Sequence, residues 1–283
     1  MQPLGRRNSP LKAISTSQRR LTHGQLFWRE AGTGPVVIFL HGSWQDGEQW
    51  QPALAELSNT FHCLAPDLLG FGASDHPTLA YSIQVEVECL AEWLQSLRIE
   101  TVHLVGHSLG AWVAATYAIR FPAQVKTLVL VDPEGLQATN GPLADGLDPW
   151  LAPRYSLVAS LLNGLRPLAK LLRQHAALDR LLQRRSLLRR YPTACRLLFG
   201  RRLQAIRAEL LTTRINQVAC PVLALHSPQA TVRVRTLSQL YAHQSMLGTL
   251  QPLTQPLQGI ATAELVAAIR DFLNQTPCGY GSD

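Results

Sequence analysis

Alternating strand and helix patterns constrain the fold of this chain more than any other feature of its sequence. Continuous apolar, β-rich runs predict buried strands, and the segments between them have helical periodicity. We predict strands at residues 35–40, 61–65, 102–105 and 127–131, and helices at residues 51–57, 82–97 and 109–120. Strands that alternate with helices form βαβ units, so this pattern predicts an α/β fold with a mostly parallel twisted sheet flanked by helices.

The alternation stops in the second half of the chain. From about residue 149 to 213 the sequence is rich in leucine and arginine and offers no convincing strand. A strand pattern resumes at residues 221–226, a weaker one lies near Leu250, and residues 262–273 predict a closing amphipathic helix. The divisions that we expect are a basic disordered tail at 1–20, a body at 21–134 and 217–274, a helical cap inserted at 135–216, and a second tail at 275–283.

The charge of the chain is unevenly distributed. The formal net charge is +7, but residues 146–216 hold 14 Lys and Arg against three acids, a local charge of +11 that leaves −4 for the rest. Such an asymmetry predicts that the basic segment faces an anionic partner, for which an anionic membrane surface is one candidate. A solvated arginine face is the alternative. The segment has few interleaved aromatic residues, so we expect no nucleic-acid partner.

Composition excludes several other classes of protein. Hydrophobic residues make up 46% of the chain, which is typical of a globular protein and too high for a disordered one. No run approaches 18 uninterrupted apolar residues, so we expect no membrane span. The five cysteines form no CxxC pair and predict reduced thiols without a zinc site. We expect no metal or organic cofactor, and a protein that is cytoplasmic or peripheral to a membrane.

A five-residue motif lies between a predicted strand and a predicted helix. Residues 106–110 read Gly-His-Ser-Leu-Gly and match G-x-S-x-G. At a sharp turn from strand to helix, the central Ser108 would be exposed in a strained backbone conformation. The helix N-terminus that follows it favours developing negative charge.

Two further motifs precede the G-x-S-x-G motif, whose sharp turn is called the nucleophile elbow. Together the three motifs carry a family resemblance. The first predicted strand ends in His41-Gly42-Ser43, and residues 67–75 read Asp-Leu-Leu-Gly-Phe-Gly-Ala-Ser-Asp. With these motifs the chain resembles the α/β-hydrolase fold superfamily over about residues 28–132, and more loosely from 221 to 273.

The resemblance implies a set of site residues. Ser108 would be the nucleophile, and the backbone N–H groups of Ser43 and Leu109 would form the oxyanion hole, with Trp44 as a second donor candidate. Trp44 and His107 are also candidate substrate-binding residues, although bracing the turn is the more ordinary role for His107. A serine at the elbow implies acyl transfer through an acyl-enzyme, unlike the aspartate of relatives that open epoxides or displace halide.

The other two members of the family's triad are not matched. In the family an acid follows the penultimate strand and a histidine precedes the closing helix. Here no Asp or Glu occurs between Glu209 and Glu264, Ala230 stands near the expected acid, and residues 259–260 read Gly-Ile where the family usually has Gly-His. A serine without a base to accept its proton is a poor nucleophile.

Two residues could replace the missing pair. Asp132 follows the strand at 127–131, and His226 ends the strand at 221–226. If these strands are neighbours, Ser108 and His226 lie roughly 10 Å apart at the strand ends, so loops must close the gap. The alternative is that Asp132, which precedes Pro133, forms an ordinary turn and His226 is structural.

Two functions therefore remain open. The family resemblance favours an ester or acyl hydrolase that acts through Ser108 on a small apolar or lipid-like substrate. The unmatched positions favour a catalytically degenerate relative that binds a ligand or a membrane surface.

Overall fold

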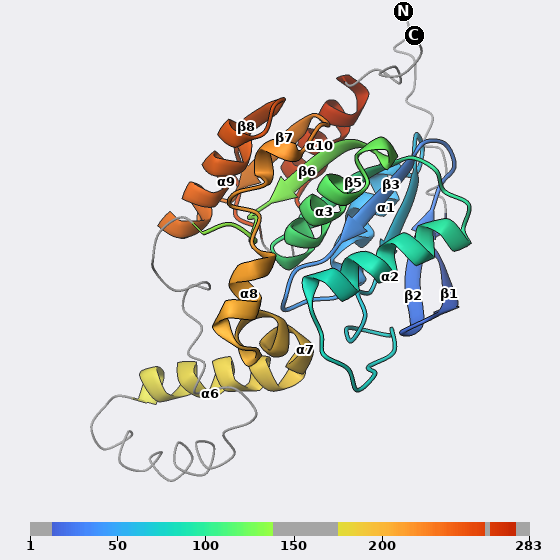
Figure 1. Cartoon of the computed structure of the whole chain (residues 1–283). Coiled ribbons are helices and arrows are strands. Elements are labelled where there is room, and N and C mark those ends of the chain that lie inside the picture. The colour runs from blue at the N-terminus through green and yellow to red at the C-terminus, as the bar shows by residue number, and fades with distance from the viewer. Residues whose placement is uncertain (1–12, 138–174, 258–260, 276–283) are drawn as a thin grey trace, which may run out of the picture.

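A single eight-stranded sheet organises the protein (Figure 1). The structure, a computed structural model, describes residues 13–137, 175–257 and 261–275. Along the sheet the order is β1-β2-β4-β3-β5-β6-β7-β8, with β1 and β2 antiparallel to their neighbours and the other pairs parallel. The strands are β1 (Ser15–Leu21), β2 (Gly24–Ala31), β3 (Val36–Leu40), β4 (His62–Pro66), β5 (Val102–His107), β6 (Val125–Val131), β7 (Val222–His226) and β8 (Gly248–Pro252). The predicted α/β fold class is confirmed.

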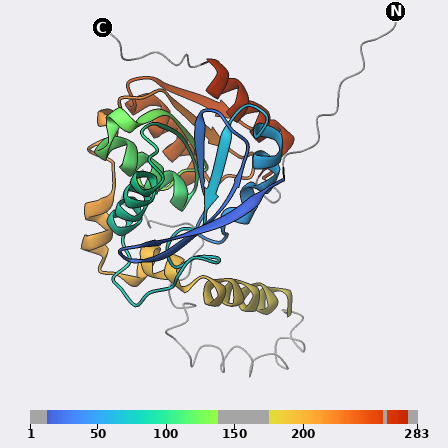
Figure 2. The same ribbon diagram turned by 90° about the vertical axis from the view of Figure 1, so that its right-hand side faces the viewer.

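Helices cover both faces of the sheet, as Figures 1 and 2 show. On one face pack α2 (Ile83–Ser96), α3 (Leu109–Arg120) and α9 (Val232–Gln244). On the other pack α1 (Gln51–Leu57) and α10 (Ala263–Gln275). Burial on both faces explains why the central strands are apolar throughout instead of alternating. The Ser82 hydroxyl accepts from the Val85 N–H and caps α2 as an N-cap serine does.

The N-terminal strands differ from what the sequence suggests. The tail expected to be disordered through residue 20 instead enters β1 at Ser15, where it pairs with β2 in an antiparallel hairpin. Five of the seven β1 residues are exposed, because β1 is the edge strand of the sheet. An edge strand with so little buried surface has no hydrophobic alternation from which it could be predicted.

A helical segment, residues 175–209, lies between β6 and β7. It contains α6 (His175–Arg190), α7 (Pro192–Cys195) and α8 (Leu203–Glu209), and no strand is present in this described part, as the sequence predicts. Leu178 and Leu188 of α6 pack with Cys195 and with Trp44 of the body. Residues 138–174 lie outside the described part of the chain, so the expected cap boundaries at 135 and 216 remain predictions.

The thiols that the structure describes are all buried. Cys63, Cys89, Cys195 and Cys220 are free, and burial raises the pKa of each to about 12, 12, 11 and 12 respectively. Thiols in such surroundings are unreactive at neutral pH.

A carboxyl group is buried in the first turn of α2. Glu86 is 1% exposed, its Oε2 accepts from the Leu69 N–H at 3.1 Å, and its Oε1 has no partner among the described residues. Burial disfavours the charged form and raises the pKa of Glu86 from 4.5 to about 8.

We expect Glu86→Gln to stabilise the protein at neutral and alkaline pH. The folded state holds the proton of Glu86 more tightly than the unfolded state, so stability falls by about 1.4 kcal/mol per pH unit from the unfolded pKa up to the folded one. At pH 7 the gain from the substitution is about 3 kcal/mol. Urea unfolding at several pH values measures it. Glu88→Gln is the control, since Glu88 is 43% exposed on the same helix and should shift stability by less than about 1 kcal/mol. A benefit of Glu86→Gln that does not grow with pH would contradict this reasoning.

Candidate active site

The elbow of the G-x-S-x-G motif has the geometry that the sequence predicts. Strand β5 ends at His107, α3 begins at Leu109, and Ser108 between them has φ 50° and ψ −110°. A side chain at positive φ is strained, and such strain concentrates at functional sites. The carbonyl oxygen of Ser108 accepts from the N–H groups of Ala111 and Trp112, and a Cβ on Gly110 would collide with the carbonyl oxygen of Leu40. Glycine is therefore needed where the helix crosses β3.

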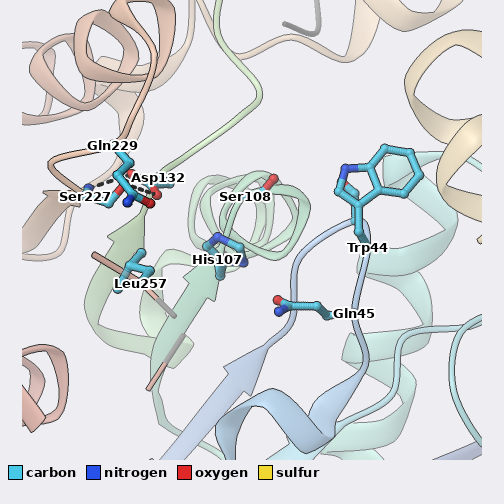
Figure 3. A pocket seen from close by; sticks show the side chains of 9 residues that line it. Trp44, Gln45, His107, Ser108, Asp132, Ser227, Gln229 and Leu257 are labelled. Carbon is cyan, nitrogen blue, oxygen red and sulfur yellow. Dashed lines mark hydrogen bonds between the residues drawn. The ribbon is translucent and has the colours of Figure 1, made fainter. Parts of the chain in front are cut away.

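Ser108 lies in a pocket at the carboxyl ends of the central strands. The pocket has a volume of about 330 Å³ and is shown in Figure 3. Its lining contains the predicted Ser43, Trp44, His107, Ser108 and Asp132, together with Gln45, Ser227, Gln229 and Leu257. Five of the seven predicted site residues thus meet around one cavity. Leu109 is fully buried at the first turn of α3, and His226 is not in the lining.

The two predicted oxyanion donors are free to bind. Within the described residues, neither the Ser43 N–H nor the Leu109 N–H has a hydrogen-bond acceptor. For Leu109 this follows from its place, because the first N–H groups of a helix have no partner within the helix. Two backbone N–H groups beside a serine hydroxyl can stabilise a negatively charged oxygen.

The loop that carries Ser43 is braced from below. His41 accepts from the Leu68 N–H at 3.0 Å through Nε2, and Gln49 accepts from the Gly42 N–H at 3.2 Å. Trp50 is fully buried in the core beneath the loop. Burial lowers the pKa of His41, which suits a neutral ring that accepts a hydrogen bond.

Asp67 holds the same loop with an ion pair. It is fully buried, and its Oδ1 accepts from Arg29 Nη1 at 2.8 Å and from the Gly47 N–H at 2.7 Å. Its Oδ2 accepts from the Ala73 N–H at 2.7 Å. His41 and Asp67 therefore brace the strand-end loops.

The carboxylate of Asp132 accepts two hydrogen bonds from Ser227, the residue that follows β7. Its Oδ1 accepts from the Ser227 N–H at 2.9 Å and its Oδ2 accepts from the Ser227 hydroxyl at 3.0 Å. Asp132 also has a positive φ of 43°. Both oxygens of the carboxylate are thus directed to Ser227 at the pocket wall, and Figure 3 shows these bonds.

His226 is not part of this arrangement. Its Nδ1 lies 3.3 Å from the carbonyl oxygen of Ser227, and within the described part of the chain no hydrogen bond joins it to Ser108 or Asp132. The structure therefore brings Asp132 to the pocket of Ser108 but does not assemble the relocated triad. At the positions where the family has its acid and base, Ala230 is partly buried and residues 259–260 lie outside the described residues.

His107 is the one histidine among the described residues that line the pocket. Its Nδ1 is buried, packs against Gly42, and has no hydrogen-bond partner in the described structure. Burial lowers the pKa of His107 to about 4, with Asp132 acting in the opposite direction and His41 in the same one. A neutral imidazole beside Ser108 can accept a proton or bind a ligand, but it is a weak base.

Two more buried polar atoms of the lining have no partner among the described residues, Ser43 Oγ and Gln45 Oε1. Buried polar groups are usually hydrogen-bonded, so these atoms and His107 Nδ1 are available to a ligand. Sequence reasoning missed Gln45, Ser227, Gln229 and Leu257. The first three could have been found from their position, since each closely follows a strand at the carboxyl edge of the sheet. Leu257 carries no comparable signal.

Two further classes of site have no counterpart among the described residues. No three His, Cys, Asp or Glu side chains gather there as metal ligands. No described helix is both long and apolar enough to cross a membrane.

Comparison with known proteins gives matches over both parts of the body. The model of the Alpha/beta hydrolase family matches residues 37–270. An uncharacterized protein of Mycobacterium tuberculosis is 40% identical over 125 residues, which cover 44% of this chain and 37% of that protein. The 2-hydroxy-6-oxo-2,4-heptadienoate hydrolase of Pseudomonas putida is 36% identical over 126 residues, 42% of this chain and 44% of that enzyme. These matches span less than half the length of either relative.

A solved structure supports the fold over nearly the whole chain. The crystal structure of a bacterial membrane phospholipase A superposes with a TM-score of 0.72, covering 94% of this chain and 87% of that one at 18% identity. At this identity the likeness concerns the fold alone.

Proposed function

The chain belongs to the alpha/beta hydrolase family, and from that premise we propose that it hydrolyses carboxylic esters through an acyl-enzyme formed on Ser108. The observation that carries the proposal is the elbow: Ser108 is held at positive φ in the pocket, next to two backbone N–H groups that have no acceptor among the described residues. That combination supplies a nucleophile and a site for the oxyanion.

The reaction would proceed in two steps. Ser108 Oγ attacks the ester carbonyl carbon, the N–H groups of Ser43 and Leu109 stabilise the oxyanion, and the alcohol leaves as the acyl-enzyme forms. Water then attacks the acyl-enzyme and releases the acid and the free serine. His107 is the pocket group that we assign to accept the Ser108 proton and return it to the leaving alcohol. Because the pKa of His107 is about 4, we expect turnover to be slow.

The pocket suits a small apolar or lipid-like acyl group. Trp44 and Leu257 give it apolar walls, and a volume of about 330 Å³ limits the size of the group that enters. The Pseudomonas putida relative is a hydrolase, which agrees with the reaction class.

A second function is favoured by one specific observation. Among the described residues no imidazole is hydrogen-bonded to Ser108, and both oxygens of Asp132 are bound to Ser227. A relative in which the nucleophile has no activating base would bind acyl or carbonyl ligands in the same pocket without turning them over.

Labelling with a fluorophosphonate probe distinguishes the two functions. For an activated serine, we expect stoichiometric labelling of the native protein, with the adduct found on the peptide that contains Ser108. The heat-denatured protein should not be labelled, because its serine has lost the oxyanion donors. Absence of labelling in the native protein would leave ligand binding as the function.

The pH dependence of the labelling rate tests the assignment of His107. At pH values between about 6 and 8, a base with a folded pKa near 4 is already neutral, so the rate should stay constant and fall only in acid. A fall centred near pH 6.5 would point to a different histidine. A rate that rises tenfold per pH unit would point to hydroxide instead of a side chain.

A further inference from the structure

Residues 135–216 carry more positive charge than the rest of the protein can balance. In the printed sequence, residues 135–216 hold 14 Lys and Arg against four Asp and Glu, a net charge of +10, which leaves −3 for the remainder. The described residues 175–216 alone contain ten arginines and two acidic residues. One of the two acids, Glu209, forms an ion pair with Arg201, with Oε2 and Nη2 2.6 Å apart.

Four of the five arginines of α6 are exposed, and the fifth, Arg185, is buried. Leu178 and Leu188 face the body, where they contact Cys195 and Trp44. Arg180, Arg184 and Arg190 are exposed, and Leu187 lies on the same side of the helix with 38% of its surface exposed. We call these four residues the outer face of α6. Figures 1 and 2 show that α6 lies at the opposite end of the molecule from α10.

The chemistry of the outer face favours a lipid surface over other anionic partners. An exposed leucine among arginines can enter the headgroup region while the arginine heads remain at the phosphates. Leu203 of α8 adds a second apolar side chain to the described segment, 50% exposed. A nucleic-acid surface would call instead for exposed aromatic residues that stack on bases, and the outer face has none.

We propose that the outer face of α6 docks the protein on membranes that contain anionic phospholipids. Each Lys or Arg near such a surface increases partitioning by about fivefold. The docked segment is next to the pocket, since Trp44 lines the pocket and also packs against the α6 cluster, with its ring 6.3 Å from that of Tyr191. Docking therefore brings the pocket wall near the lipid. It does not depend on the proposed hydrolysis.

Sedimentation of the full chain with vesicles tests the proposal. The vesicles are phosphatidylcholine alone, or phosphatidylcholine with roughly a quarter of phosphatidylglycerol. We expect binding only to the anionic vesicles, weakened by salt. The variant Arg180→Gln, Arg184→Gln, Arg190→Gln should lose about a hundredfold in partitioning. Leu187→Asp, on the same face, should also reduce binding.

Two control variants remove the same number of charges elsewhere. One replaces Arg6, Arg7 and Lys12 of the N-terminal tail with glutamine, and the other replaces the exposed Arg19, Arg98 and Lys126 of the body. We expect each to retain binding within about tenfold of the wild type. Circular dichroism confirms that each variant is folded, and Ser108→Ala should bind vesicles like the wild type, which separates docking from hydrolysis.

The proposal is overturned by any of three results. The first is equal binding to neutral and anionic vesicles. The second is a loss in the tail or body variant as large as that in the α6 variant. The third is binding to double-stranded DNA that is stronger than binding to anionic vesicles and is lost in the same α6 variant.

Discussion

Replacing Ser108 with alanine should lower ester turnover by roughly a thousandfold or more and abolish fluorophosphonate labelling. The expected loss is large because no other group replaces the nucleophile: the oxyanion donors alone can polarise a carbonyl but form no acyl-enzyme. The loss should fall on kcat and on kcat/KM alike, since the hydroxyl acts in the transition state and not in binding. Short-chain ester hydrolysis by the purified variant measures it.

A matched variant keeps this prediction specific. Ser15→Ala removes the hydroxyl of an exposed serine at the start of β1, at the edge of the sheet and outside the pocket lining, and should leave turnover unchanged. If Ser108→Ala and the wild type hydrolyse esters at the same rate, then Ser108 is no nucleophile and the ligand-binding function is favoured.

The second large effect that we expect concerns stability. Asp67→Ala should lower the free energy of unfolding by about 3 kcal/mol, because it leaves the charge of Arg29, whose side chain is 13% exposed, without its ionic partner. It also removes the acceptor of two backbone N–H groups, those of Gly47 and Ala73. Urea unfolding at neutral pH measures the change.

A second arginine–carboxylate ion pair of the same length, but exposed to solvent, provides a control. Arg270 and Glu56 are 2.8 Å apart, as are Arg29 and Asp67, but their side chains are 42% and 43% exposed, against 13% and 0%. Glu56→Ala should therefore cost less than about 1 kcal/mol. Equal effects of the two substitutions would show that burial does not set the strength of the Asp67 ion pair.

The central sheet could be predicted from the sequence because its strands are buried on both faces. Continuous apolar runs identified β3, β4, β5, β6 and β7, and the helix predicted at residues 109–120 coincides with α3. The same reasoning fails where burial is slight. Strand β1 is mostly exposed, and α9 has a weakly apolar face, so neither has the periodicity on which the prediction depends.

The sequence predicts which residues of the candidate site come to the strand ends, but not on which face of the sheet their side chains lie. The rule that strand ends share one edge correctly placed Ser108 and Asp132 at the same pocket. It failed for His226 because the face on which a side chain lies alternates along a strand. Ala224 and Leu225 belong to the cores on opposite faces of the sheet, so His226 lies on the face of Ala224. By the same alternation His107 lies on the face of Val105, which is the other one.

The elbow, Asp132 and Ser227 stand at the ends of three successive strands, β5, β6 and β7, whose register is set by main-chain pairing of His107 with Val131 and of Val131 with Leu225. Main-chain pairing does not depend on which side chains follow it. A lineage carrying this sheet can therefore gain or lose reactivity by exchanging residues at the strand ends while the fold persists, and an engineer who wishes to install a new acid or base has three neighbouring positions that the architecture leaves open.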